Sequence, residues 1–162
     1  MDDESKVLYR RCLSAYATGV AVVTVRDERG GVVGLTVNSF TSISLDPPLI
    51  LWSLGNASDR GAFFREADRF AVNILGAEDA DFAAACARRG NYCPDPARIE
   101  PGDPPLVKGA LTRLKCFAVQ RTPVADHLLI IAEVEAYETR DGDGLIYFRS
   151  RYGRAATIPR DA

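Results

Sequence analysis

Neutral polar side chains are concentrated in residues 34–49 of this 162-residue chain, in a segment that otherwise has the composition of β-strand. Five hydroxyls and one amide occur there: Thr36, Asn38, Ser39, Thr41, Ser42 and Ser44. Two strands would present such groups alternately on two faces. A strand in the protein core does not need so many polar side chains, whereas a site for a flat ligand with hydrogen-bonding edges does. Threonine and serine are also common on exposed strand faces, so composition alone leaves a ligand site and a plain surface strand both open.

A second group of candidate residues follows at 53–60, in a loop that precedes a predicted helix. Free N–H groups at a helix N-terminus favour phosphate, and Ser58 and Arg60 could add a hydroxyl and a positive charge. Simple capping of the helix by Ser58 or Asn56 is the alternative. His127 is the only histidine, and it precedes an apolar strand, where a structural and a catalytic role are both open.

Three other patterns resemble known sites but lack their remaining parts. Gly-Gly-Val-Val-Gly at 30–34 does not have dinucleotide spacing, and no helix follows it. Asp-Gly-Asp-Gly at 141–144 lacks the other ligands of a calcium loop and predicts a tight turn. None of the four cysteines forms a C-x-x-C pair. We interpret Cys86 and Cys93 as buried or idle thiols, with a metal or redox site as the alternative.

The elements that must position these residues are mostly short strands. Hydrophobic periodicity predicts helices at 6–17, 59–66 and 78–88. Runs rich in β-branched residues predict strands at 20–25, 32–37, 49–54, 69–75, 110–121, 128–139 and 145–149, the first two joined as a hairpin. Pro47 and Pro48 should end the polar segment, because proline cannot donate to a ladder. Residues 91–105, with five prolines, predict a long loop.

Many short strands with few helices and no βαβ alternation predict a mainly β, closed or nearly closed barrel in a single domain, 1–162. The net charge of −2 gives no basic footprint for nucleic acid. The N-terminus is acidic rather than signal-like, and no apolar run is long enough to cross a bilayer. We therefore expect no nucleic-acid or membrane partner and a cytoplasmic location.

Four further segments occur in an order typical of a known family. With the run 34–49, the most specific is Ala-Tyr-Ala-Thr-Gly-Val-Ala-Val-Val-Thr at 15–24. The others are Arg-Phe-Ala-Val-Asn-Ile-Leu at 69–75, Asp126-His127, and Tyr-Phe-Arg-Ser-Arg-Tyr-Gly at 147–153. From about residue 8 to residue 153 the chain resembles the short-chain flavin reductases. The resemblance implies a split β-barrel of the Greek-key, FMN-binding type with a few flanking helices. Ala125 stands where the family has glycine, and Asn56 and Arg60 depart from its loop pattern.

The resemblance also implies an activity, transfer of hydride from NAD(P)H to N5 of FMN or FAD, with reduced flavin passing to a partner monooxygenase. It places His127 near the nicotinamide. It places the following residues at the flavin: Thr36, Val37, Asn38, Ser39, Phe40, Thr41, Ser53, Asn56, Ser58, Arg60 and Tyr152. A homodimer is expected, since a second subunit would complete the groove.

Two alternatives stay open at this point. One is a non-enzymatic flavoprotein, an electron carrier or sensor with tightly bound FMN. The other is an oxidoreductase that retains its flavin and acts on an organic substrate. The sequence does not distinguish FMN from FAD or NADH from NADPH.

Overall fold

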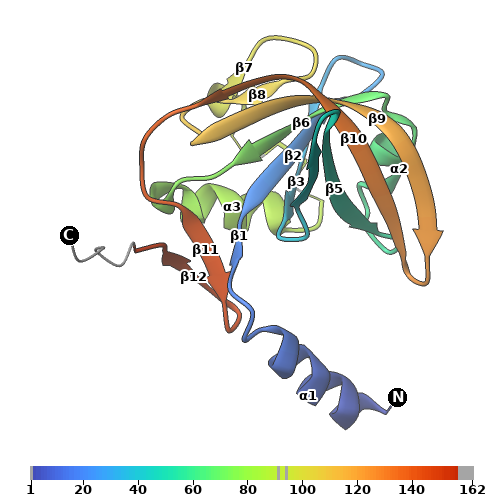
Figure 1. Cartoon of the computed structure of the whole chain (residues 1–162), viewed down its shortest axis with the longest axis vertical. Coiled ribbons are helices and arrows are strands. Elements are labelled where there is room, and N and C mark those ends of the chain that lie inside the picture. The colour runs from blue at the N-terminus through green and yellow to red at the C-terminus, as the bar shows by residue number, and fades with distance from the viewer. Residues whose placement is uncertain (1, 91, 94, 157–162) are drawn as a thin grey trace.

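The computed structural model describes residues 2–90, 92–93 and 95–156. A curved, antiparallel sheet of seven strands in the order β3-β2-β6-β9-β10-β5-β4 forms most of it (Figure 1). Its strands are β2 (Ala21–Arg26), β3 (Val32–Val37), β4 (Thr41–Leu45), β5 (Pro48–Gly55), β6 (Arg69–Ile74), β9 (Thr112–Val124) and β10 (His127–Thr139). The described chain is therefore mainly β, as predicted.

Two smaller sheets and a few helices surround the barrel. One sheet, ordered β1-β11-β12, joins β1 (Thr18–Gly19), β11 (Leu145–Phe148) and β12 (Arg151–Arg154); the other pairs β7 (Ile99–Glu100) with β8 (Leu106–Val107). The helices are α1 (Asp3–Leu13), α2 (Gly61–Glu66), α3 (Ala80–Ala87) and the short 3-10 turns η1 (Ala77–Asp79) and η2 (Pro96–Arg98). None of the helices in the described part of the chain is both long and apolar enough to span a membrane.

The valine-rich strand β2 is buried on both of its faces. Val23 belongs to the core inside the barrel, where Trp52 makes edge contacts with Phe64 and Phe70 at ring-centroid distances of 5.5 and 5.8 Å. Val22 belongs to a second core beneath α3. A strand covered on both sides has no polar face, which explains its continuous apolar run.

The double proline ends the polar segment as predicted. Strand β4 stops at Leu45, the bond between Asp46 and Pro47 is cis, and Pro48 opens β5. The predicted loop at 91–105 is shorter than expected, because η2 and β7 lie within it. Several short strands were missed, namely β1, β7, β8 and β12. The sequence analysis placed nothing regular after residue 149, but β12 returns along β11.

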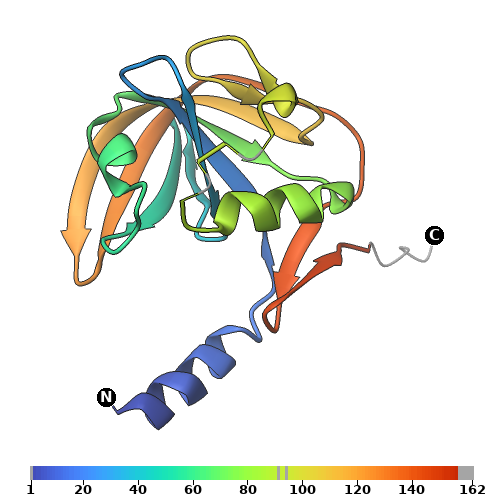
Figure 2. The same cartoon turned by 180° about the vertical axis from the view of Figure 1, so that it is seen from behind.

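Helix α1 extends away from the barrel (Figures 1 and 2). It begins earlier than predicted, since the Asp2 carboxylate accepts a hydrogen bond from the Ser5 N–H at 2.8 Å and caps it. None of its residues is buried, even the apolar ones: Val7, Leu8 and Leu13 are 66%, 61% and 56% exposed. An isolated helix of 11 residues is marginal in water, so α1 needs a surface to cover its apolar side chains.

Candidate functional site

A hollow of about 180 Å³ lies where the end of β3 meets α3 and the β11–β12 hairpin. Its lining residues are Val20, Thr36, Val37, Asn38, Ala87, Tyr147 and Tyr152. Four of the predicted flavin-site residues, three from β3 and its end and one from β12, are thus brought together. Sequence reasoning missed the other three, because an alanine, a valine and a tyrosine assigned to packing carry no chemical signal of their own.

Hydroxyl groups of the polar segment are largely bonded within the protein. Thr36 Oγ1 donates to the Ala83 carbonyl at 2.7 Å, which ties β3 to α3. Ser39 Oγ donates to the Ser53 carbonyl at 3.2 Å and accepts from the Ser53 N–H at 3.0 Å. These hydroxyls position the segment rather than pointing freely at a ligand, which revises the expectation that they meet the flavin edge. Asn38, by contrast, is exposed at the rim of the hollow.

The link between β3 and β4 supplies backbone groups at the same place. Residues 38–40 lie between the pairing of Val37 with Ala21 and that of Thr41 with Leu51, and they pair with no strand in the described part of the chain. Phe40 packs against the barrel core. Thr41 is exposed, and its hydroxyl bonds only weakly, at 3.4 Å, to the Ser42 carbonyl. The link can therefore offer N–H and C=O groups to the edge of a planar ring.

A second cluster forms where β5 ends beside the turn between β9 and β10. Gly55 pairs with His127. Asn56 donates its backbone N–H to the Asp126 carbonyl at 2.8 Å and its side-chain amide to the Ala125 carbonyl at 3.4 Å. Since Ser39 bonds Ser53 on β5, the two clusters are connected along one edge of the barrel.

His127 is half exposed, and its Nδ1 lies 2.8 Å from Asp126 Oδ1. The hydrogen bond from His127, together with its charge, holds the pKa of Asp126 below its usual value. A carboxylate in this position fixes the orientation of the imidazole ring. A β-carbon at Gly55 would lie 3.7 Å from His127 Nε2, so glycine there leaves that ring edge open.

Ala125 adopts a backbone conformation that normally requires glycine. Its φ is +50°, whereas Asp126, the second residue of the two-residue loop, is not among the residues with positive φ. This pattern of φ signs is that of a type II′ turn, in which glycine is preferred at the first loop position. The structure thus gives a physical reason for the family's glycine, and Ala125 retains the turn at a cost in backbone strain.

Arg60 lies inside the protein rather than at a phosphate site. It is 1% exposed, and its guanidinium donates to the carbonyls of Cys86 and Arg88 and lies 5.8 Å from the Tyr92 ring centroid. The expectation that it offers a free positive charge to a ligand is therefore corrected. Capping by Ser58 or Asn56 is also wrong: Arg60 occupies the cap position of α2 without a side-chain bond, and Ser58 Oγ only accepts from the Arg60 N–H at 3.3 Å.

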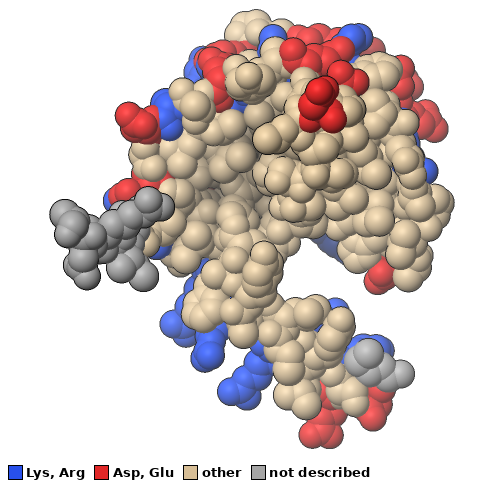
Figure 3. All heavy atoms as spheres, in the orientation of Figure 1, with Lys and Arg blue, Asp and Glu red and all other residues tan. Residues whose placement is uncertain are grey.

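Tyr152 forms one wall of the hollow from β12. Its ring lies against Tyr147 at a centroid distance of 5.4 Å and an interplanar angle of 60°. Burial raises the pKa of its phenol, so the side chain is neutral at physiological pH. Figure 3 shows acidic side chains gathered around the β7–β8 end of the molecule. None of the described residues that line the hollow is charged, so its walls suit a neutral ring system.

Comparisons with known proteins agree with this arrangement. Residues 13–156 match the family described as flavin reductase like domain. The chain belongs to the flavin reductase family. It is 38% identical to the FMN reductase (NADH) SmoA of Agrobacterium fabrum, over 93% of this chain and 87% of that protein. It is 36% identical to the NADH-dependent flavin reductase StyB of Pseudomonas fluorescens, over 93% and 90% of the two chains.

Solved structures of other flavin reductases share the fold. The styrene monooxygenase flavin reductase of Pseudomonas putida S12 superposes with a TM-score of 0.85 at 36% identity, over 93% of this chain and 99% of that one. The NADH:FAD oxidoreductase SgcE6 of Streptomyces globisporus, solved with NAD and FAD fragments, gives a TM-score of 0.88 at 30% identity, over 96% of each chain. The split barrel expected for a flavin reductase is therefore confirmed.

Proposed function

We propose that this flavin reductase transfers hydride from reduced nicotinamide to FMN or FAD bound at the hollow between β3, α3 and the β11–β12 hairpin. The observation that carries the proposal is the convergence of Thr36, Val37, Asn38 and Tyr152 on that hollow. Relatives named for NADH dependence favour NADH as the donor.

The residues at the hollow fit an isoalloxazine ring. Val20, Val37 and Ala87 are apolar, Tyr152 adds a neutral aromatic face, and Asn38 offers an amide that can both donate and accept. When bound, the flavin supplies the hydride acceptor. The protein's part is orientation: the residue 38–40 link meets the ring edge, and neutral groups there impose no fixed charge against the transfer.

We assign the His127 cluster to the nicotinamide. Asp126 fixes the imidazole and Gly55 leaves one edge of it open, so the ring can serve as a rigid wall for a second planar group. Hydride transfer needs alignment rather than an acid or base, so His127 acts by positioning. The route from Ser39 through Ser53 to Gly55 connects this cluster with the flavin hollow.

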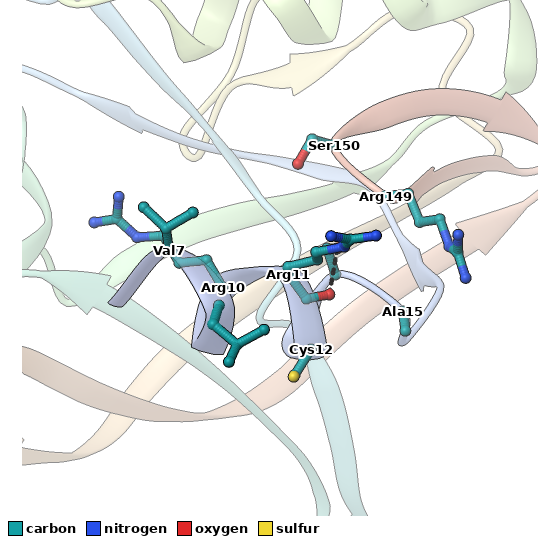
Figure 4. A pocket seen from close by; sticks show the side chains of 9 residues that line it. Val7, Arg10, Arg11, Cys12, Ala15, Arg149 and Ser150 are labelled. Atoms are coloured by element: carbon teal, nitrogen blue, oxygen red, sulfur yellow. Dashed lines mark hydrogen bonds between the residues drawn. The ribbon is translucent and has the colours of Figure 1, made fainter. Parts of the chain in front are cut away.

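A second copy of the chain is proposed to complete the site. The hollow of about 180 Å³ is smaller than the roughly 300–1,000 Å³ of typical ligand pockets, so one protomer supplies only part of it. A groove of about 680 Å³ also opens between α1 and the β11–β12 turn (Figure 4). It exposes Val7, Leu8 and Ala15 beside Arg149. A homodimer that covers both regions should appear in light scattering as a single species of twice the chain mass.

Reduced flavin is proposed to pass by diffusion to a monooxygenase in the cytoplasm. Support comes from relatives whose names include the reductase component of a trigonelline monooxygenase in Acinetobacter baylyi. A solved neighbour is the flavin reductase component of a two-component tryptophan halogenase. The described cysteines are all free thiols, in keeping with a reducing compartment.

The decisive experiment mixes the protein with NADH and a large excess of free FMN without oxygen. Loss of the flavin's visible absorption over many equivalents per protein is the expected result. A flavoprotein that keeps its cofactor is the second candidate, favoured by the strained Ala125 beside the nicotinamide cluster. Such a protein would bleach one equivalent of flavin at most. No bleaching at all would reject both the reductase of free flavin and the enzyme that retains its flavin. Ser42→Ala, on the exposed strand β4, is the matched control.

A further inference from the structure

Two cysteines that the reductase chemistry does not use face one small hollow behind β3. Cys86, at the end of α3, is 1% exposed, and Cys93, in the segment that follows α3, is half-buried. Both line one narrow gap, too tight to hold a water molecule, together with Val22, Thr24, Val32, Gly34, Phe82, Tyr92 and Ile99. The thiols of α3 and of the following segment thus share one environment.

Contacts at Gly34 bring the two segments close together. The Gly34 N–H donates to the Tyr92 carbonyl at 2.7 Å. A β-carbon at Gly34 would lie 3.6 Å from Cys86 Sγ and 3.6 Å from the Tyr92 carbonyl oxygen, so these two atoms are no more than twice that distance apart. Cys93 is the next residue in the chain, and its side chain lines the same gap as Cys86.

The end of α3 also forms part of the flavin hollow. Ala87, next to Cys86, lines that hollow, and the Thr36 hydroxyl holds β3 to α3 through the Ala83 carbonyl. Tyr152 lines the same hollow, and its pKa is raised by burial first and then by its electrostatic interaction with Tyr147 and with Cys86. Cys86 therefore lies between the flavin hollow and the gap that it lines with Cys93. A covalent bond at its sulfur would alter the packing of both.

We propose that Cys86 and Cys93 form a reversible disulfide that ties the residue 92–93 segment to α3 and weakens flavin binding. The oxidant is hydrogen peroxide, which arises when reduced flavin that meets no monooxygenase reacts with oxygen. This source of peroxide depends on the proposed function, whereas formation of the disulfide does not.

The reaction balances as one two-electron oxidation of sulfur by peroxide, followed by a condensation of the oxidised sulfur with the second thiol. The Cys93 thiolate attacks one peroxide oxygen, the O–O bond breaks, and the leaving hydroxide takes a proton to give water and a sulfenic acid. The Cys86 thiol then loses its proton and attacks the sulfenic sulfur, the S–O bond breaks, and a second water leaves. Two thiols and one peroxide give one disulfide and two waters; sulfur is oxidised and peroxide reduced.

Burial makes the response slow. It raises the pKa of Cys86 to about 12, and the neighbouring Cys93 adds to that shift. Burial also raises the pKa of Cys93. Both groups are therefore protonated thiols at neutral pH, and thiolate is the reactive form. The disulfide should form under sustained peroxide rather than at its first appearance.

The experiment treats the fully reduced, full-length protein with hydrogen peroxide and maps its peptides by mass spectrometry without reductant. We expect a cross-linked peptide joining Cys86 to Cys93, lighter by two hydrogens and restored by dithiothreitol. Quenching of Trp52 fluorescence by FMN should then show a dissociation constant for FMN that is raised about threefold or more. A threefold change corresponds to less free energy than one hydrogen bond contributes. Cys12→Ser, on exposed α1, should retain both effects.

Cys93→Ser should lose both effects, with circular dichroism verifying that the half-buried variant folds. Three results would overturn the proposal. These are peroxide products confined to sulfinic or sulfonic acids, a cross-link that involves Cys12 instead, and a Cys86–Cys93 bond that leaves FMN affinity unchanged. Because peptide mapping needs no NADH turnover, a failed reductase assay would not be confused with a failed disulfide.

Discussion

Replacing Asn38 with alanine should weaken flavin binding without loosening the fold, and replacing Ser39 should do the reverse. The Asn38 side chain is exposed at the hollow and has no hydrogen-bond partner within the described part of the chain. Its loss removes about one hydrogen bond to the ligand, worth about 0.5–1.5 kcal/mol, or roughly 2- to 13-fold in dissociation constant. Stability should change by less than about 0.5 kcal/mol.

Ser39→Ala removes two hydrogen bonds to Ser53, at 3.0 and 3.2 Å. The Ser53 N–H is left without that partner in a half-buried position, so unfolding should become easier by about 1–2 kcal/mol. Flavin should still bind once the link between β3 and β4 is in place, within about twofold of the wild-type affinity.

One protein preparation serves both measurements. Trp52 is the only tryptophan, is fully buried, and precedes Ser53, so its emission reports flavin by energy transfer and unfolding by exposure to water. Flavin titration and urea denaturation of wild type, both variants and Ser42→Ala complete the set. Equal loss of affinity in Asn38→Ala and Ser39→Ala, with both folds intact, would refute the hydrogen-bond assignments from which the contrast was derived.

Three further substitutions test separate parts of the account. His127→Ala should lower kcat/KM for NADH by about tenfold, or 1.4 kcal/mol, while flavin affinity stays unchanged; complete loss of turnover would imply a chemical rather than a positioning role. Arg60→Ala should destabilise the protein by about 3 kcal/mol through lost charge-assisted bonds to buried carbonyls, yet leave FMN binding by the folded fraction intact; a specific loss of FMN affinity would restore the phosphate assignment. Ala125→Gly should raise stability by about 0.5–1 kcal/mol by relieving the φ of +50°, and a lowered urea midpoint would contradict that.

The positions of the longer strands could be predicted because a buried strand has a characteristic local composition. The run that forms β2 is β-branched almost throughout, and the structure buries it on both faces. Strand β12 was missed for an equally local reason. The turn before it uses Arg149 and Ser150 at positive φ, positions where asparagine or glycine would have signalled a hairpin.

Site residues were predictable by segment but not by role. The sequence contains the hydroxyls of Thr36 and Ser39, but only the folded chain shows that Ala83 and Ser53 are their partners. Arg60 was misassigned because its destination depends on carbonyls at the end of α3, 26 and 28 residues away. Spacing along a chain carries no information about such tertiary partners.

The most direct test is a crystal structure of the protein soaked with FMN. The account predicts the isoalloxazine ring against Val37 and Asn38, with Tyr152 on one side and a clear path toward His127. Density for the ring in the groove between α1 and the β11–β12 turn, with the β3 hollow empty, would contradict it.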